Sequence, residues 1–187
     1  MINNERIVIV GFGELAKELI SWMIESRLFI KIEERLFFID DKENKNFCIN
    51  NIKVTCLGKI SEFFPAKEDK LYLGIADPKI KFKIVNELIK RKANFQSFIH
   101  PSVILSPSAE YGKGCIIFPY SVCSYNSKLN DFITVNTHSA IGHDVFIDSF
   151  CTISSFVDLT GNVHLGKRVL VGSGARFLPK VKIGKDS

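Results

Sequence analysis

The sequence has few of the features that mark secreted, disulfide-bonded or membrane proteins. It has no apolar run near 18 residues and no signal-peptide pattern, so neither a membrane span nor export is expected. Its five cysteines are odd in number and form no Cys-x-x-Cys pair, which favours reduced thiols and a cytoplasmic setting. With 46% hydrophobic and 24% charged residues, the 187-residue chain is neither disordered nor fibrous and has room for one large domain or two modest ones.

Charge of one sign is not concentrated anywhere in the chain. The formal net charge of +5 is spread along the sequence, so a nucleic-acid partner is not expected, whereas a small anionic ligand is compatible with it. The short basic runs at 79–83 and 90–92 are best explained as the solvated face of a helix.

The first hundred residues alternate between strand-like and helix-like stretches. Apolar runs at 6–10, 36–39 and 71–75 predict buried strands, and the pattern at 14–26 predicts a helix. A second helix is expected after Pro78, and its apolar face is predicted to consist of Ile80, Ile84, Val85, Leu88 and Ile89. Strand, helix and strand in this order predict a small parallel sheet with right-handed crossovers.

The second half follows a different rule, a strict period of six residues. Apolar or core-compatible residues occupy every sixth position: Leu105, Tyr111, Ile117, Cys123, Leu129, Val135, Ile141, Ile147, Ile153, Leu159, Leu165, Val171, Phe177 and Ile183. A small or β-branched residue follows four places after each of the first thirteen, from Ala109 to Val181. This period is typical of a parallel β-helix, in which three hexapeptides make one triangular coil and the leading residue points inward.

Such a short stack leaves flat faces that other copies of the chain can cover, so a homotrimer is expected. The segment 183–187 opens a further coil, and the sequence leaves open whether the natural C-terminus extends past Ser187. We therefore predict an α/β Rossmann-like domain at 1–98 followed by a left-handed β-helix at 99–187.

Four segments carry a resemblance to a known family. Their order, 8–13 (VIVGFG), 38–41 (FIDD), 136–144 (NTHSAIGHD) and 160–163 (TGNV), resembles that of the sugar O- and N-acetyltransferases of sialic-acid and bacillosamine-type pathways (NeuD/PglD-like). These belong to the hexapeptide-repeat acyltransferase superfamily, and the resemblance covers nearly the whole chain. It implies a trimer that binds acetyl-CoA between subunits, holds a free or nucleotide-linked sugar in the N-terminal domain, and needs no metal.

The resemblance also implies a catalytic pair, with His143 as general base and Asp144 as the acidic residue that follows it. An acetyl thioester is already activated, so the enzyme mainly positions the acceptor and removes a proton, a role that neutral imidazole suits. Because neighbouring residues on a strand point opposite ways, Asp144 is expected to act from an adjacent position or through its backbone. His138 either lines the same cleft and binds substrate or only satisfies a turn, while His100 and His164 are expected to be structural.

The donor and the acceptor are assigned to different parts of the chain. Acetyl-CoA is expected to lie along the later coils, and the oxyanion donor is a backbone N–H near Gly142 or Gly161. The residues assigned to acetyl-CoA are Gly161, Gly172, Ser173, Gly174 and Thr152; Thr152 stands where family members often have a His, and Ser155-Phe156 replaces their Pro-Gly. The residues assigned to the substrate are Gly11, Gly13, Asp40, Asp41, Asp77, Lys81 and His138.

Other interpretations remain open from the sequence. The loop 11–16 matches the GxGxxA dinucleotide fingerprint, but no downstream region resembles a dehydrogenase. His138 and His143 have the spacing of two ligands in γ-type carbonic anhydrases, although the position expected for the third ligand holds Ser102. A non-catalytic sugar-nucleotide-binding scaffold is the alternative from a third class. The leading hypothesis is acetyl-CoA-dependent acetylation of an amino sugar for cell-surface glycans, with O-acetylation of a sialic-acid-type sugar as its close variant.

Overall fold

The computed structural model describes residues 5–29, 31–42 and 45–187. Contacts divide the chain into two compact units, Met1–Ile75 with Lys83–Gln96, and Ala76–Phe82 with Ser97–Ser187. Within the described residues, no helix combines the length and apolar character that crossing a bilayer requires.

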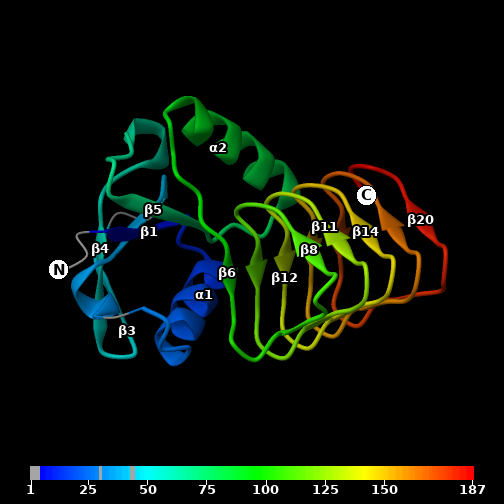
Figure 1. Ribbon diagram of the computed structural model, residues 1–187. Coiled ribbons are helices and arrows are strands. Elements are labelled where there is room, and N and C mark those ends of the chain that lie inside the picture. Colours follow the sequence, from blue (N-terminus) through cyan, green and yellow to red (C-terminus); the bar gives the residue numbers. More distant parts are fainter. Residues whose placement is uncertain (1–4, 30, 43–44) are drawn as a thin grey trace. The chain divides into compact units, whose positions relative to one another are not determined.

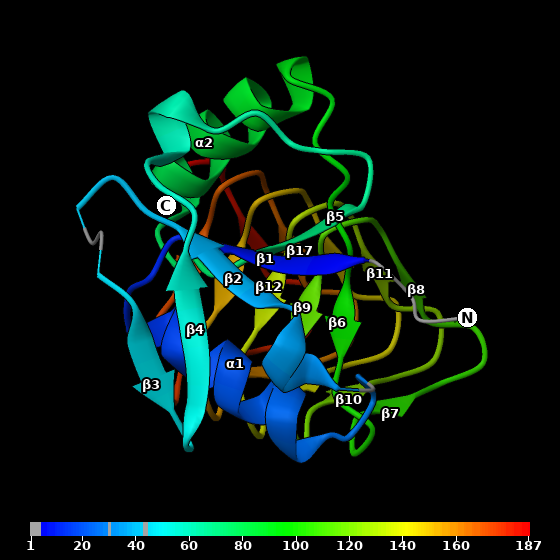
Figure 2. The ribbon, with the colours of Figure 1, turned by 90° about the vertical axis from the view of Figure 1, so that its left-hand side faces the viewer.

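The first unit is built on a five-stranded sheet with the order β3-β4-β2-β1-β5 (Figure 2). Its strands are β1 (Arg6–Val10), β2 (Leu36–Ile39), β3 (Phe47–Ile49), β4 (Ile52–Cys56) and β5 (Asp69–Leu73). Its helices are α1 (Glu14–Glu25), the later turns of α2 (Pro78–Lys90), and two 3₁₀ turns at Ile32–Glu34 and Ile60–Glu62. β1 pairs in parallel with β2 and β5, β4 joins β2 in parallel, and only β3 runs antiparallel, against β4.

The sequence predicted three of these strands and missed two. β1 and β2 have the predicted bounds, whereas β5 begins two residues earlier than predicted because Asp69 and Lys70 also pair with β1. The hairpin formed by β3 and β4 was not predicted. β3 consists of only three apolar residues, which is shorter than the run of about four to eight on which a strand prediction rests, and it lies at the sheet edge.

The buried face of α2 also differs from the prediction. Val85 and Leu88 are fully buried as expected, but Ile80 is 51% exposed and Ile89 is 40% exposed. The residue that continues the buried face, one helical turn before Val85, is Lys81, which is fully buried. The sequence does not predict a lysine on a buried helix face, because lysine is almost never buried without a compensating environment.

One ion pair anchors the start of the first unit's sheet. The fully buried carboxylate of Asp69 accepts two hydrogen bonds from Arg6, from Nε at 2.6 Å and Nη2 at 2.9 Å. It also accepts the backbone N–H of Ala66 at 2.8 Å. A buried carboxylate needs such partners, because desolvation of an unpaired charge is costly.

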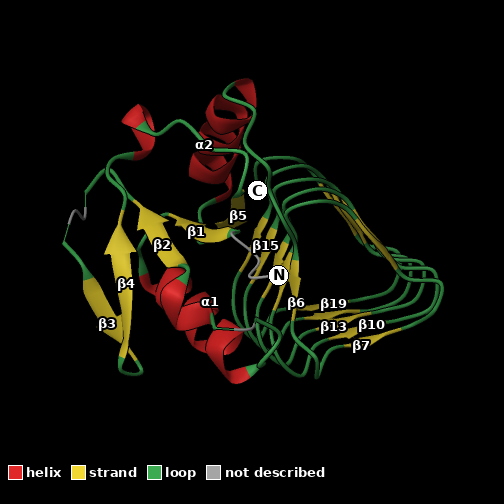
Figure 3. Cartoon of the chain, turned by 60° about the vertical axis from the view of Figure 1, so that its left-hand side comes forward, coloured by secondary structure: helices red, strands yellow, loops and turns green. Residues whose placement is uncertain are grey.

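The second unit is a three-sided stack of parallel strands (Figure 1, Figure 3). One side holds β6 (Phe98–Ile99), β9 (Ile116–Ile117), β12 (Thr134–Val135), β15 (Thr152–Ile153) and β18 (Leu170–Val171). The next holds β7 (Ile104–Leu105), β10 (Val122–Cys123), β13 (Ala140–Ile141), β16 (Asp158–Leu159) and β19 (Arg176–Phe177). The last holds β8 (Glu110–Tyr111), β11 (Lys128–Leu129), β14 (Phe146–Ile147), β17 (His164–Leu165) and β20 (Lys182–Ile183).

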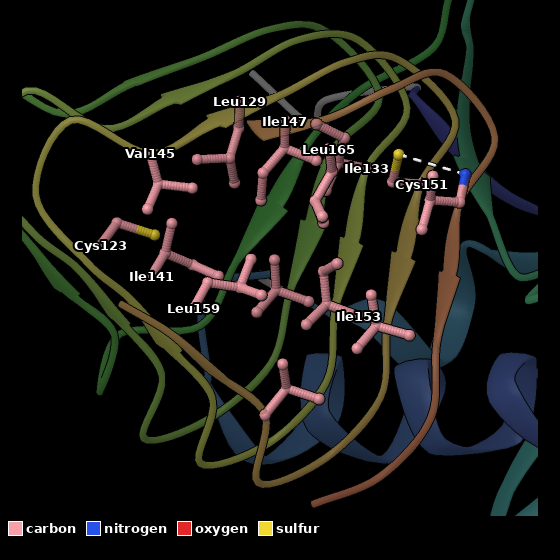
Figure 4. Packing of buried hydrophobic residues seen from close by; sticks show 14 of the residues in the cluster. Cys123, Leu129, Ile133, Ile141, Val145, Ile147, Cys151, Ile153, Leu159 and Leu165 are labelled. Carbon is pink, nitrogen blue, oxygen red and sulfur yellow. Dashed lines mark hydrogen bonds between the residues drawn. The ribbon is translucent and has the colours of Figure 1, made fainter. Parts of the chain in front are cut away.

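Every strand of this stack pairs with the strand 18 residues away, so equivalent positions form columns down each side. The predicted period of six residues is therefore confirmed as one side per hexapeptide. The leading residues fill the interior, with Ile117, Val135, Ile141, Ile147 and Leu159 all fully buried (Figure 4). Burying each such side chain contributes about 1.5–3 kcal/mol relative to leaving it exposed. At the two ends of the stack the leading residues are less covered: Leu105, Phe177 and Ile183 are half-buried, and Tyr111 is 45% exposed.

The small residues line the places where the walls converge. The hydroxyls of Ser121 and Ser139 are buried and donate to the carbonyls of Asn136 at 2.9 Å and Ser154 at 2.8 Å. Cys151 behaves as a small apolar residue whose Sγ lies 3.4 Å from the N–H of Val169, the contact drawn as a dashed line in Figure 4. These positions close the turns without leaving buried polar groups unpaired.

Candidate functional site

His143 lies at the corner between β13 and β14. This corner repeats one coil earlier and one coil later, and its turn residues are Asn126, Asp144 and Asn162, with φ of 57°, 56° and 62°. Left-handed backbone conformations cost little for Asn and Asp, whose short polar side chains bond locally. The corner therefore forms as a tight turn that projects its side chains outward. The imidazole of His143 is 60% exposed.

Asp144 and Asn126 hold the ring of His143 from one side. Nδ1 of His143 lies 2.9 Å from Oδ2 of Asp144, and Nδ2 of Asn126 donates to Oδ1 of the same carboxylate at 2.7 Å. The hydrogen bonds from Asn126 and then from His143 lower the pKa of Asp144. An ionised carboxylate only accepts, so Nδ1 carries the proton and Nε2 of a neutral ring keeps a lone pair.

The direct contact between His143 and Asp144 differs from the expectation that adjacent side chains point apart. That expectation holds for residues on a strand, but Asp144 has left the strand and adopts a left-handed turn conformation. The turn brings its carboxylate beside the ring of the preceding residue.

Gly161 occupies the place directly against the His143 ring in the next coil. A Cβ at this position would overlap Nε2 and Cε1 of His143, so only glycine leaves the ring where it is. The N–H of Gly142 is already bonded to the carbonyl of Leu159 at 2.7 Å. For the N–H of Gly161 there is no acceptor among the described residues. Of the two backbone donors considered from the sequence, the one at Gly161 is available to a ligand.

His138 lies at the preceding corner of the same coil, with β13 between it and His143. Its ring lies between two aromatic rings: it stacks on Phe156, with centroids 4.9 Å apart, and is tilted by 37° against Tyr120, with centroids 5.0 Å apart. Both faces of the His138 ring are therefore next to aromatic side chains. The described residues also contain no group of three His, Cys, Asp or Glu side chains placed to hold a metal.

Lys81 and Thr152, which the sequence assigned to substrate and to acetyl-CoA, bond to each other. Nζ of Lys81 donates to the hydroxyls of Thr152 at 2.8 Å and Thr134 at 3.0 Å, and lies 3.2 Å from the carbonyl oxygen of Cys151. The hydroxyl of Thr152 donates in turn to the carbonyl of Ala76 at 2.6 Å. Burial lowers the pKa of Lys81 to about 7. The assignment of Lys81 to the substrate is therefore not supported, because its donors are directed at oxygens inside the unit.

The other predicted donor-site residues lie on the turn that follows β18. Gly172, Ser173 and Gly174 are all exposed, and a Cβ at either glycine would meet nothing within 4 Å. Together these three residues form an exposed surface without large side chains in the coil after Phe156. Asp77, by contrast, caps the start of α2, accepting the N–H groups of Lys79 at 2.8 Å and Ile80 at 2.9 Å.

In the first unit, the predicted substrate residues also bond internally. Oδ2 of Asp40 accepts the N–H of Phe12 at 2.8 Å, inside the loop that matches the dinucleotide fingerprint. Asp41 accepts both the N–H and the hydroxyl of Ser61 at 3.1 Å. Gly11 has φ of 86° and its Cβ position touches the side chain of Ile75. The Phe12 N–H is therefore already occupied by a carboxylate.

Gly13, the second glycine of the dinucleotide fingerprint, is not packed against another side chain as Gly11 is. It is the N-cap of α1, and a Cβ added to it would meet nothing within 4 Å. Space beside the backbone therefore remains at Gly13, whereas Gly11 is tightly packed. Of the two glycines assigned to the substrate, Gly13 is the accessible one.

Sequence reasoning missed Asn126, Tyr120 and Phe156. The signal that identifies them is the distance of one coil, because Asn126 precedes Asp144 by 18 residues, and Tyr120 and Phe156 flank His138 by the same interval. Motif reading along the chain does not pair residues this far apart.

Comparison with solved structures shows the same fold in several proteins, among them an acetyltransferase domain, while no family model matches the chain. The acetyltransferase domain of PglB from Neisseria gonorrhoeae superposes with a TM-score of 0.85 at 22% identity over 97% of this chain and 86% of that one. A further structure of that domain is a complex with acetyl coenzyme A. PerB from Caulobacter crescentus, in complex with CoA and GDP-perosamine, gives a TM-score of 0.84 at 24% identity over 98% and 84% of the two chains. WeeI from Acinetobacter baumannii gives 0.71 at 18% identity over 96% and 94%. At these identities the likeness shows the fold.

Proposed function

We propose that this chain transfers the acetyl group of acetyl-CoA to an amino sugar carried on a nucleotide, with His143 as general base. The observation that carries the proposal is the arrangement of Asn126, Asp144 and His143 in line, with the ring of His143 against Gly161. Proteins with the same fold bind acetyl coenzyme A, or CoA with GDP-perosamine.

In the proposed transfer, each group has a role. Nε2 of His143 accepts the proton of the acceptor amine as nitrogen attacks the thioester carbonyl. Asp144 keeps Nδ1 protonated and stabilises the imidazolium that forms. We assign stabilisation of the oxyanion to the N–H of Gly161, an assignment supported by its having no acceptor within the described residues. The imidazolium then protonates the departing thiolate of CoA.

The finer features belong to the same proposal. We propose that 99–187 wind as a left-handed β-helix with acetyl-CoA along Gly161, Gly172, Ser173 and Gly174, and that 1–98 form a Rossmann-like domain for the sugar nucleotide. A homotrimer in the cytoplasm, needing no metal, is part of this proposal. The proposed site does not include Lys81, Thr152 and Asp77, because hydrogen bonds inside the second unit engage their side chains.

The test is transfer from acetyl-CoA to a panel of UDP-, GDP- and dTDP-linked amino sugars, followed by mass spectrometry and thiol release. His143→Ala is expected to lower the rate by about 10²–10⁴-fold with its circular dichroism and melting temperature unchanged. Asn126→Ala should cause a smaller loss. Its matched control is Asn162→Ala at the same corner one coil later, where the backbone strain is equal but the side chain does not orient Asp144.

The outcomes separate the alternatives. An amide product resists mild alkaline hydrolysis and an ester does not, which distinguishes N-acetylation from acetylation of a sialic-acid-type hydroxyl. Absence of transfer to every sugar nucleotide, with binding intact and unchanged in His143→Ala, would instead indicate a non-catalytic scaffold.

A further inference from the structure

Three aromatic residues form a ladder on the surface of the second unit. Tyr120, His138 and Phe156 occupy the same corner in three successive coils, and all three have left-handed φ of 61°, 59° and 59°. The rings of His138 and Phe156 stack at 4.9 Å with an interplanar angle of 13°. Tyr120 and Phe156 remain 60% and 63% exposed. Left-handed φ recurs at other corners of the stack, such as Phe132 and Phe150, so what distinguishes this column is that its aromatic rings are exposed.

The ladder stops where the next rung is expected. The residue one coil after Phe156 is Gly174, which has φ of 73° and so the same corner conformation, but no side chain. A Cβ added there would meet no atom within 4 Å. The face of Phe156 toward Gly174 is therefore open, and the space of one rung is vacant beneath it.

Groups beside the vacant rung suit a nucleotide. Ser173 is exposed and continues the column of hydroxyls in which Thr137 donates to Ser155 at 3.3 Å. Arg176, two residues past Gly174, starts β19 and is exposed on its outer side, because the next residue, Phe177, packs toward the interior. A hydroxyl can bond the edge of a base, and a guanidinium can bind a phosphate.

We propose that the vacant rung at Gly174 binds the base of a nucleotide, which stacks on Phe156 as a fourth member of the ladder. Stacking on an exposed aromatic face tolerates any base, and the ladder's centroid spacing of 4.9–5.0 Å lies within the range of stacked rings. The base comes either from the acyl donor or from the sugar nucleotide. Assigning the base to the acyl donor or to the sugar nucleotide rests on the proposed function, whereas the proposal that a base stacks on Phe156 does not.

The test is calorimetric binding of adenosine 3′,5′-bisphosphate, UDP and GDP to the full chain without acceptor or turnover. Phe156→Ala is expected to weaken binding of at least one of them by about 10- to 100-fold. Phe156→Trp should restore it. Gly174→Tyr should weaken binding similarly, because its own ring fills the rung at a corner that already accommodates a tyrosine in the equivalent position.

Tyr120→Ala is the matched control. It removes an equally exposed ring from the other end of the ladder, and leaves the face of Phe156 toward Gly174 unchanged. A Phe156-dependent loss for the bisphosphate alone assigns the site to the donor, and a loss for UDP or GDP assigns it to the sugar nucleotide. Unchanged affinity for all three nucleotides in Phe156→Ala, or no binding by the wild-type chain, would overturn the proposal. A change of sedimentation mass in Phe156→Ala with nucleotide affinity intact would also overturn it, identifying the ladder as a subunit contact. A chain that binds nucleotides through Phe156 but transfers no acetyl group refutes the proposed function and not this inference.

Discussion

Replacing Lys81 by methionine should remove a pH-dependent cost from the stability of the protein. Burial lowers the pKa of this lysine to about 7, against 10.5 for an ordinary lysine, and the unfolded chain regains the ordinary value. Between these two values the unfolded state binds a proton that the folded state does not. The free energy of unfolding therefore rises with pH across the window from about 7 to 10.5, and this contribution is lost as pH falls to 7.

The size of the effect follows from the same shift. Each pH unit inside the window is worth about 1.4 kcal/mol, so the whole shift corresponds to on the order of 5 kcal/mol. The four oxygens around Nζ, from Phe132, Thr134, Cys151 and Thr152, explain why a buried lysine is tolerated at all. They accept its N–H groups in the charged form. In the neutral form, the hydroxyl of Thr134 can turn and donate to the lone pair.

Two measurements check this reasoning. The ¹³Cε chemical shift of Lys81, assigned with the Lys81→Met variant, is expected to titrate near pH 7, well below the 10.5 of an ordinary lysine. The gain in melting temperature of the wild type between pH 7 and pH 9 should be reduced in Lys81→Met, with Lys79→Met, an exposed neighbour on the same helix, as control. An ordinary titration of Lys81 near pH 10 would refute the argument that desolvation outweighs the surrounding oxygens.

Two further predictions concern close packing and ion pairing. Gly161→Ala should displace the ring of His143 and lower kcat for acetyl transfer by about 100-fold. The control is Gly184→Ala, whose Cβ meets nothing within 4 Å and which should leave kcat unchanged. Equal rates in the two variants would contradict the argument that a Cβ at Gly161 crowds the ring. Asp69→Ala should cost about 1–3 kcal/mol in chemical denaturation monitored on the first unit, less than a fully buried pair because Arg6 is 34% exposed. A midpoint unchanged from wild type would show that Arg6 and Asp69 contribute nothing measurable.

The sequence predicts the second unit well because its fold depends on one local rule. A period of six residues places Ile141 and Ile147 on neighbouring sides of the stack, and the interior found there agrees with that prediction. His143 and Asp144 were also identified as a pair, but their direct hydrogen bond was not, because it depends on the left-handed turn at Asp144.

What the sequence did not predict depends on contacts between distant residues. Asn126 reaches Asp144 only because coils stack at an interval of 18 residues. Lys81 was assigned to a solvated helix face and to the substrate, although its environment is supplied by residues more than fifty positions later, such as Thr134. In the hairpin β3–β4, only β3 is too short for periodicity to indicate it; β4 alternates apolar and polar residues over Ile52–Cys56, a signal that the sequence analysis overlooked.

The stacking interval of 18 residues has a consequence for how such a chain tolerates change in length. Removing a whole coil of 18 residues away from the site would leave every remaining side chain on the same side of the stack. The site would then keep its geometry, and the stack would only be shorter. Removing a single hexapeptide between Asn126 and His143 would keep the interior apolar but turn all later residues by one wall. The imidazole would then sit at a different edge from the amide that orients its carboxylate. The fold would survive this deletion, and the chemistry would not.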